Sequence, residues 1–223
     1  MAAIDFFPLL YDNWSGSKSQ DSCSVSEHAE QATLRSLKIH KTGARFLQYE
    51  QDLVKSVPNN TTRMSSILED LDCDGISFFI DQKNEEHIIF AELKSAFDTK
   101  KITYAFHQII QSFLKMNMWL SNCKDYDLHT IHLHFIVACQ TFKDDNQKNT
   151  VLHMISQSQM IQRNTLEGKF LYDLLHKGYK SVSLSDFEDI RKLPFHDAIT
   201  NKLVTIYLQR TANYGDFDVS ITL

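Results

Sequence analysis

Residues 73–95 read CDGISFFIDQKNEEHIIFAELKS, and this stretch decides how the centre of the chain folds. It contains two apolar runs, at 76–80 and 87–93, with the polar segment DQKNEE between them. Runs rich in Ile and Phe that flank a short polar break are typical of a β-hairpin. The sequence therefore predicts two adjacent antiparallel strands that fold about Asn84.

Three charged residues lie at the open end of this predicted hairpin: Asp74, Glu92 and Lys94. A hairpin centred on Asn84 places Asp74 opposite Lys94. Because alternate residues of a strand share a face, Glu92 and Lys94 point to one side while Leu93 points to the other. We therefore expect the two carboxylates and the ammonium group to converge within a few ångströms.

Such a cluster suits Mg²⁺, or Mn²⁺ in its place. Mg²⁺ takes oxygen ligands and is usually held by one or two carboxylates together with substrate phosphates. Asp74 and Glu92 would supply the carboxylates, and the backbone carbonyl of Leu93 a further oxygen. Lys94 would orient the attacking water or neutralise charge that develops at phosphorus. The alternative is a simple salt bridge, worth about 0–1 kcal/mol when exposed.

This arrangement resembles the PD-(D/E)xK nuclease superfamily, whose members have a restriction-endonuclease-like fold. In that family an aspartate opens one strand, a Glu-x-Lys lies on the next strand, and a helix follows. Asp74, Glu92-Leu93-Lys94 and a predicted helix over 100–120 match this pattern, with Cys73 in place of the proline that names the motif. The resemblance implies an α/β (α+β) fold with a mixed central β-sheet flanked by helices. It also implies catalytic roles for Asp74, Glu92 and Lys94.

Two further site residues are assigned through the same resemblance. Several branches of the superfamily carry a glutamine on the helix after the Glu-x-Lys, and Gln108 in ITYAFHQIIQSF matches it. Gln108 lies on a polar stripe opposite the Ile/Phe face, so a solvated helix surface is the alternative. Family members also often supply a glutamate from an N-terminal helix. We assign this role to Glu30, on a helix predicted to follow a capping box at 24–27, with Glu50 and Glu69 as alternatives.

The chain is expected to form a single nuclease-like domain over residues 1–223, a length that allows one full hydrophobic core. The motif-bearing core covers about 25–140 and includes a buried strand within 130–142. Residues 145–223 would add helices and strands that complete or decorate this core. The last of these elements are predicted to form a hairpin that turns near 213–216.

Composition and charge exclude several classes of protein. Hydrophobic residues make up 43% and charged residues 23%, ordinary values for a soluble globular protein. No segment has the roughly 18 uninterrupted apolar residues of a membrane span, and the 4 cysteines form no CxxC pair. We therefore expect a cytoplasmic protein with reduced thiols and no membrane partner. The formal net charge of −5 argues against nonspecific coating of nucleic acid, although a local basic face would still bind phosphates.

Three histidines near the predicted strand at 130–142 raise the question of a second metal site: His129, His132 and His134. His132 and His134 share a strand face, but the sequence offers no third ligand at a suitable spacing. Partly buried strand histidines are therefore the favoured interpretation.

These features predict a Mg²⁺-dependent endonuclease that hydrolyses DNA, with RNA as the other possible substrate. The resemblance implies a place in bacterial restriction or anti-phage defence, with a protein partner or a homo-oligomer as the active assembly. One alternative is a catalytically inactive family member that acts as a protein- or nucleic-acid-binding module. The other is a structural subunit whose salt bridge only looks like a site. The arrangement of Asp74, Glu92 and Lys94 in space distinguishes the last possibility from the first.

Overall fold

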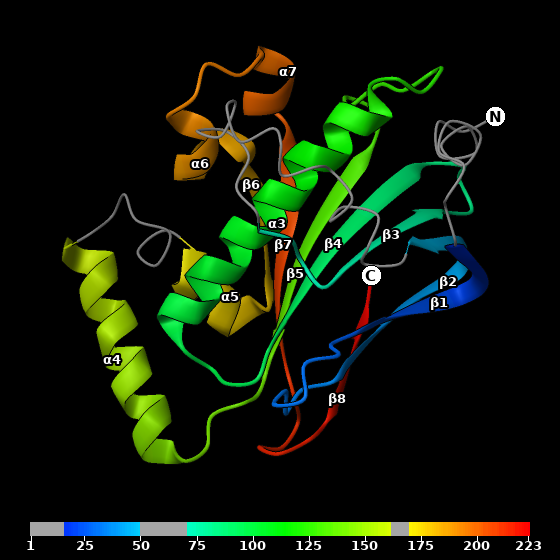
Figure 1. The fold of residues 1–223 in the computed structure, drawn as a ribbon. Coiled ribbons are helices and arrows are strands. Elements are labelled where there is room, and N and C mark those ends of the chain that lie inside the picture. The colour runs from blue at the N-terminus through cyan, green and yellow to red at the C-terminus, as the bar shows by residue number, and fades with distance from the viewer. Residues whose placement is uncertain (1–15, 50–70, 162–169) are drawn as a thin grey trace.

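The structure is a computed structural model that describes residues 16–49, 71–161 and 170–223. Its strands are β1 (Gly16–Ser26), β2 (Ser36–Tyr49), β3 (Gly75–Ile80), β4 (Glu86–Lys94), β5 (His132–Cys139), β6 (Tyr179–Ser183), β7 (Leu203–Arg210) and β8 (Asp218–Thr222). Together they form one open mixed sheet, in the order β1-β2-β3-β4-β5-β7-β6, with β8 paired to β2 outside this path (Figure 1). The predicted α/β class with a mixed central sheet is confirmed.

The helices of the described residues are α3 (Thr99–Leu120), α4 (Asp145–Ile161), α5 (Tyr172–Lys177), the 3₁₀ helix η3 (Leu184–Asp186), α6 (Glu188–Arg191) and α7 (Asp197–Thr200). Helix α3 confirms the helix predicted at 100–120 and lies across the sheet in front of β4 and β5 (Figure 1). Its N-cap, Asp98, accepts hydrogen bonds from the backbone N–H groups of Lys100 and Lys101 at 2.8 and 3.1 Å. Within the described ranges, no helix is long and apolar enough to cross a membrane.

The predicted β-hairpin is present, since β3 and β4 are adjacent antiparallel strands. Its turn is organised by Asp81, whose Oδ1 accepts hydrogen bonds from the N–H groups of Lys83 and Glu85 at 2.8 and 2.9 Å. The backbone N–H of Asp81 donates to the carbonyl of Glu85 at 3.1 Å and closes the turn. Asn84 has a φ of 62°, a left-handed conformation that asparagine adopts more readily than most residues.

The register of this hairpin differs from the prediction by two residues. Ile76 pairs with Phe90, and continuing the ladder by one pair beyond Gly75 places Asp74 opposite Glu92 rather than Lys94. The difference arises because the turn closes between residues 81 and 85 and is not centred on residue 84. A shift of two residues keeps every side chain on its predicted face, because side chains alternate with a period of two.

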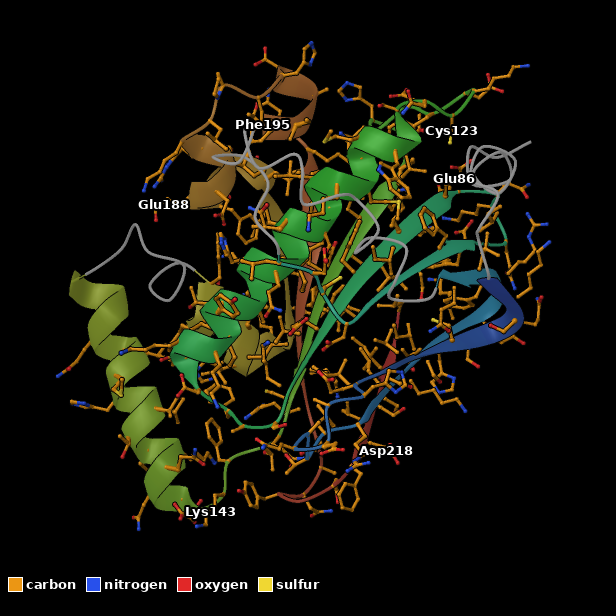
Figure 2. The ribbon with its side chains drawn as sticks, in the orientation of Figure 1. Glu86, Cys123, Lys143, Glu188, Phe195 and Asp218 are labelled. Carbon is orange, nitrogen blue, oxygen red and sulfur yellow. The ribbon has the colours of Figure 1, made fainter. Side chains whose placement is uncertain are left out.

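Strand β4 lies at the centre of the sheet and is buried on both faces. It pairs antiparallel with β3 and parallel with β5, and β7 is parallel to β5 on the far side. Ile88 and Phe90 pack into the core beneath α3, whereas Ile89, Ala91 and Leu93 pack into a second core with β1, β2 and β8. Figure 2 shows side chains between α3 and the strands beside it, β4 and β5. Burial on both faces explains why β4 is a continuous apolar run.

The N-terminal helix predicted from the capping box at 24–27 is wrong, because this segment is the end of β1. Cys23 and Val25 are buried and the serines at 22, 24 and 26 are exposed or half-buried, and Leu37 and Ile39 of β2 repeat this alternation. A period of two marks a strand with one buried face. Gly43 has a φ of 75° and lies inside β2, so its left-handed backbone conformation does not mark the end of a helix.

The predicted C-terminal hairpin is also wrong, although both of its strands exist. Strand β7 pairs with β5 on one edge and with β6 on the other, so neither edge is left for β8. Strand β8 instead pairs in parallel with the first part of β2, from Ser36 opposite Asp218 to His40 opposite Thr222. The turn near 213–216 therefore carries the chain from one part of the sheet to another.

Gly75 allows the end of β1 to approach the start of β3 closely. A Cβ atom at this position would lie 2.6 Å from Cγ1 and 2.8 Å from Cγ2 of Val25, closer than real Cβ contacts. Val25 is buried, with 1% of its surface exposed, so it has little room to move. This close approach holds the end of β1 against the residue that follows Asp74.

We expect Gly75→Ala to destabilise the fold by about 1–3 kcal/mol, because the added methyl group overpacks against Val25. Val25→Ala should destabilise the fold through a cavity, yet it should create the space that the Gly75→Ala methyl group needs. The double variant should therefore lose less stability than the sum of the two single losses. Urea unfolding of the four proteins measures this coupling, and strictly additive losses would show that the two residues do not clash.

Candidate active site at the open end of the β3–β4 hairpin

The structure brings Asp74, Glu92 and Lys94 into direct contact. The backbone N–H of Asp74 donates a hydrogen bond to Oε2 of Glu92 at 3.0 Å, and Nζ of Lys94 donates to Oε1 of the same carboxylate. Oδ2 of Asp74 accepts a hydrogen bond from the backbone N–H of Leu93 at 2.6 Å. The two carboxylates, the ammonium group and the Leu93 backbone thus form one compact cluster.

Glu92 is the unusual member of this cluster because it lies in the buried apolar run of β4. Only 2% of its surface is exposed, and Lys94 keeps 17% of its side chain accessible. Burying a carboxylate is costly unless it is paired and hydrogen-bonded. Glu92 meets this requirement through Lys94 and the N–H of Asp74. A buried carboxylate pair at the end of a strand is also a common feature of functional sites.

The environment of the two carboxylates favours their protonated forms. Burial raises the pKa of Asp74 to about 8, with a further contribution from the negative charge of Glu92. Burial likewise raises the pKa of Glu92 to about 7, although the charge of Lys94 acts in the opposite direction. Without a cation, the pair therefore holds a proton near neutral pH.

Gln108 connects Lys94 to the backbone that leads into β3. Its Oε1 accepts a hydrogen bond from Nζ of Lys94 at 2.7 Å, and its Nε2 donates to the carbonyl of Asp72 at 3.1 Å. Tyr104, one turn earlier on α3, places its ring 5.7 Å from Nζ of Lys94 and is 47% exposed. The structure thus places the predicted Gln108 side chain in contact with the site.

Beyond the half-buried Gln108, the polar side of α3 is a buried contact surface and not the solvated face considered as an alternative. Lys115 is 6% exposed and pairs with Oδ1 of Asp72 at 2.8 Å, while also donating to the carbonyl of Leu71 at 3.2 Å. Oγ of the buried Ser112 accepts a hydrogen bond from the backbone N–H of Cys73 at 2.8 Å. These contacts fix residues 71–73 and therefore the position from which Asp74 enters the site.

A third carboxylate lies near the pair, and it belongs to Glu27, directly after the end of β1. The charge of Glu27 contributes to the raised pKa of both Asp74 and Glu92. Oε1 of Glu27 also accepts a hydrogen bond from the backbone N–H of Ala29 at 2.8 Å, which orients the side chain. In the sequence, Glu27 is the last residue of the predicted capping box at 24–27, and nothing there indicates a role in the site. Its proximity to the site depends on the pairing of distant strands.

Glu30, the glutamate assigned to the site from the sequence, is exposed in the turn that follows Glu27. The structure gives it no contact with Asp74, Glu92 or Lys94, and the helix expected to carry it is absent from residues 16–49. Glu50 and Glu69, the two alternatives, lie outside the described residues.

The loop after β1, which contains Glu27 and Glu30, is anchored beside the site. Thr33 donates hydrogen bonds from its backbone N–H to Oγ of Ser95 at 3.0 Å and from its hydroxyl to the Ser95 carbonyl at 2.9 Å. Ser95 follows Lys94 directly, so these two bonds attach the turn to the end of β4. The loop after β1 is thereby held close to the carboxylate pair.

A separate group of histidines lies at the opposite end of β4. Nδ1 of His87 lies 3.0 Å from Nε2 of His134, and the ring of His87 stacks on His132 with 4.7 Å between centroids. Burial lowers the pKa of His87 to about 4 and that of His134 to about 3, with neighbouring histidine charges adding to both effects. The imidazole rings of His87 and His134 are therefore neutral at physiological pH. His134 fits the predicted partly buried strand histidine, whereas the side chain of His132 is 52% exposed.

Comparisons of this chain with protein-family models, curated proteins and solved structures find no match. The geometry of the Asp74, Glu92 and Lys94 cluster is therefore the main indication of what the protein does.

The raised pKa values predict how the metal-free fold responds to pH. In the unfolded chain both carboxylates have a pKa of about 4, so folding stabilises their protonated forms. The stability that they contribute is fully present below about pH 4 and is lost as pH rises through the folded pKa values of about 7 and 8. Asp74→Asn removes one carboxylate, and the asparagine side-chain oxygen still accepts from the Leu93 N–H.

We therefore expect metal-free Asp74→Asn to melt at least about 2 °C above the wild type at pH 8, with the difference shrinking as pH falls and disappearing below about pH 4. Differential scanning calorimetry with a chelator present gives both values. Glu30→Gln, which removes an exposed carboxylate from a nearby turn, is the matched control and should show no such trend. A lower melting temperature for Asp74→Asn at pH 8 would mean that Asp74 is a stabilising ion-pair partner.

Proposed function

We propose that this protein is a Mg²⁺-dependent endonuclease that hydrolyses phosphodiester bonds, with DNA as its substrate. The observation that carries the proposal is the cluster at the open end of the hairpin, where Lys94 and the Asp74 backbone N–H bond the Glu92 carboxylate and the Asp74 carboxylate is held on the N–H of Leu93. Asp74 precedes β3, the Glu-x-Lys ends β4, and α3 follows. This order supports a restriction-endonuclease-like core. The setting that the resemblance implies, restriction or anti-phage defence, belongs to the same proposal.

The donor set of the site fits Mg²⁺. It consists of oxygen ligands, from Asp74 and Glu92, with the backbone of Leu93 beside them and Glu27 nearby. Mg²⁺ is commonly held by one or two carboxylates together with substrate phosphates. Once bound, it would neutralise the carboxylates and stabilise negative charge on a phosphate. The raised pKa values support this fit, because burial disfavours the charged carboxylates and the positive charge of a bound cation would favour them.

Lys94 and Gln108 would act on the attacking water. Gln108 accepts from Nζ of Lys94 and is itself held by the Asp72 carbonyl, so the ammonium group has a fixed position. From there Lys94 would orient a water molecule toward phosphorus and stabilise the charge that builds up on the phosphate oxygens. In the reaction, water forms a new oxygen–phosphorus bond as one ester bond breaks. The products are a phosphate monoester and a hydroxyl group.

Tyr104 provides a reason to expect nucleic acid at this site. Its ring is 47% exposed and lies beside Lys94, next to the position proposed for the scissile phosphate. An exposed aromatic ring stacks on a nucleobase without sequence preference, typically contributing about 1–3 kcal/mol. Tyr104 would therefore contact a base or sugar adjacent to the bond that is cut.

The purified protein should cleave plasmid DNA when Mg²⁺ or Mn²⁺ is present and should be inactive with a chelator. Glu92→Gln should lower the rate at least about 10²-fold, because the negatively charged carboxylate that would hold the cation becomes a neutral amide. Glu27→Gln should also slow cleavage, whereas Glu30→Gln should not, since only Glu27 lies near the pair. A parallel assay with RNA decides the substrate. A protein that cleaves neither nucleic acid would contradict the proposal and favour the inactive binding module.

A second prediction separates catalysis by Lys94 from simple charge pairing. Arginine keeps the positive charge, but its planar fork is wider and places its donors elsewhere than the compact ammonium group. We expect Lys94→Arg to retain the fold and Mg²⁺ binding while losing at least about 10²-fold in cleavage rate, as misplacement of the water predicts. Single-turnover rates at saturating Mg²⁺ measure this loss. Lys124→Arg, an exposed substitution of the same kind, is the control. A Lys94→Arg rate within a few-fold of the wild type would make Lys94 only a counter-charge.

A further inference from the structure

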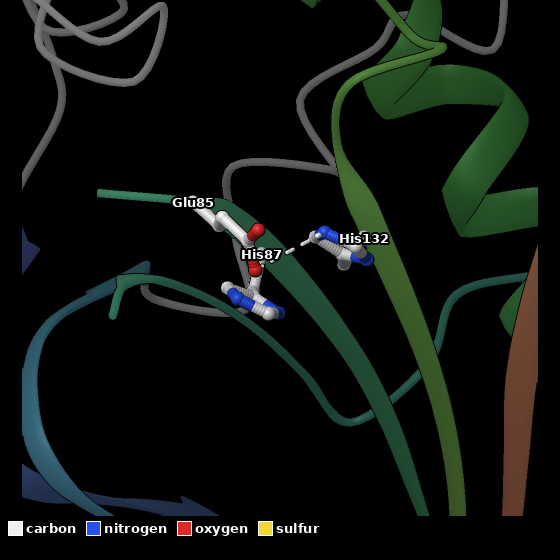
Figure 3. A group of neighbouring side chains, drawn as sticks. All are labelled: Glu85, His87 and His132. Carbon is white, nitrogen blue, oxygen red and sulfur yellow. Dashed lines mark ion pairs between the residues drawn. The ribbon is translucent and has the colours of Figure 1, made fainter. Parts of the chain in front are cut away.

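Three potential metal ligands lie together at the end of β4 opposite the proposed active site: Glu85, His87 and His132. One ligand atom from each lies within 4.8 Å of the others (Figure 3). Their meeting follows from the strand pairing, because His87 lies directly opposite His132 in the parallel β4–β5 ladder. Glu85 is two residues before His87, so its side chain is on the same side of the chain. This supplies the third ligand that sequence spacing alone did not reveal.

His87 has a buried nitrogen that lacks a hydrogen bond. The residue is 9% exposed, and its Nε2 has no hydrogen-bond partner among the described residues. The nearest acidic oxygen, Oδ2 of Asp81, is 3.8 Å away, which is too far for a hydrogen bond. Buried polar atoms of native proteins almost always have partners, so this nitrogen indicates a ligand.

A chain of contacts holds the His87 ring from its other nitrogen. Nδ1 of His87 is 3.0 Å from Nε2 of His134, and Nδ1 of His134 is 3.3 Å from the hydroxyl of Tyr207. When the Nδ1–H of His87 donates to Nε2 of His134 and the Nδ1–H of His134 donates to the Tyr207 hydroxyl, Nε2 of His87 is unprotonated. Its lone pair is then available to a metal ion. Histidines that bind metals are typically oriented in this way, by donating from their second nitrogen to a neighbouring group.

We propose that Glu85, His87 and His132 bind Zn²⁺. Nε2 of His132 and Oε2 of Glu85 are 3.6 Å apart, near the separation of about 3.3 Å expected for ligands around a tetrahedral ion with bonds of about 2.0–2.1 Å. The side chains of His132 and Glu85 are 52% and 47% exposed, so both are free to close on an ion that His87 fixes in place. Oδ2 of Asp81, 3.8 Å from Nε2 of His87, would be the nearest additional carboxylate oxygen, and water would otherwise complete the coordination.

This zinc site is chemically and spatially separate from the proposed Mg²⁺ site. His87 and Glu92 are five residues apart in β4, about 17 Å along the strand, and their side chains point to opposite faces. Glu86, labelled in Figure 2, marks the end of the strand at which the histidines lie. Two imidazoles with carboxylates suit Zn²⁺, whereas oxygen ligands alone suit Mg²⁺. Zn²⁺ here would tie β4 to β5 and to the β3–β4 turn.

Calorimetric titration of the full chain with Zn²⁺ tests this inference. The titration uses the Glu92→Gln background, so that the oxygen cluster does not contribute. We expect one equivalent of Zn²⁺ to bind with a Kd in the micromolar range or below. Adding His132→Ala should weaken binding at least about 100-fold, and Glu85→Gln should also weaken it. Both substituted side chains are largely exposed, so the fold should survive, which circular dichroism checks.

His129→Ala is the matched control, because His129 is exposed three residues from His132 and is not one of the clustered ligands. It should leave Zn²⁺ affinity unchanged. Co²⁺ in place of Zn²⁺ should give a visible absorption band typical of a low-coordinate site, and His132→Ala should remove it. Absence of Zn²⁺ binding in the Glu92→Gln background would overturn the proposal. Equal affinity with and without His132→Ala would overturn it as well.

Discussion

A carboxylate buried at the end of a central apolar strand is the constraint on which the rest of this site depends. Glu92 lies on the α3 face of β4, with 2% of its surface exposed. Removing a charged group from water costs on the order of several kcal/mol, which its partners must offset. Lys94 and the backbone N–H of Asp74 supply that compensation on the two oxygens. The compensation is incomplete, since the pKa of Glu92 remains raised.

The surrounding structure holds these partners in place from three directions. Helix α3 contributes Gln108 and Lys115, which attach Lys94 and the segment before β3 to the helix. Strand β1 packs against Gly75, and the loop after it is bonded to Ser95 beyond the Glu-x-Lys. If the proposed function holds, a site fixed in this way would need little rearrangement to bind a cation and a phosphate, as electrostatic catalysis requires. The other end of the same strand carries the cluster of Glu85, His87 and His132, in which His134 holds the ring of His87 in place.

The parts of the structure that could be predicted from the sequence are those determined by local patterns. Two apolar runs with a polar break define the β3–β4 hairpin, and a strict alternation of faces brings Asp74, Glu92 and Lys94 together despite the two-residue error in register. Glu27 and His87 could not be identified, because their partners come from strands that are distant in sequence or are set by the β4–β5 register. The helix predicted to follow the capping box at 24–27 is wrong because a short capping pattern received more weight than the alternation of apolar residues at the end of β1 and the start of β2. The partners of β7 and β8 likewise depend on which strand edges remain free.

The proposed divalent-cation site at Asp74 and Glu92 can be tested by anomalous diffraction from crystals grown with Mn²⁺. We expect a manganese peak at bonding distance from one oxygen of each carboxylate, with Lys94 nearby and no nitrogen among the protein ligands. Its height should fall to the background level in Glu92→Gln crystals grown under the same conditions. A wild-type map with no peak at this position, and with Lys94 still paired to Glu92, would contradict the account.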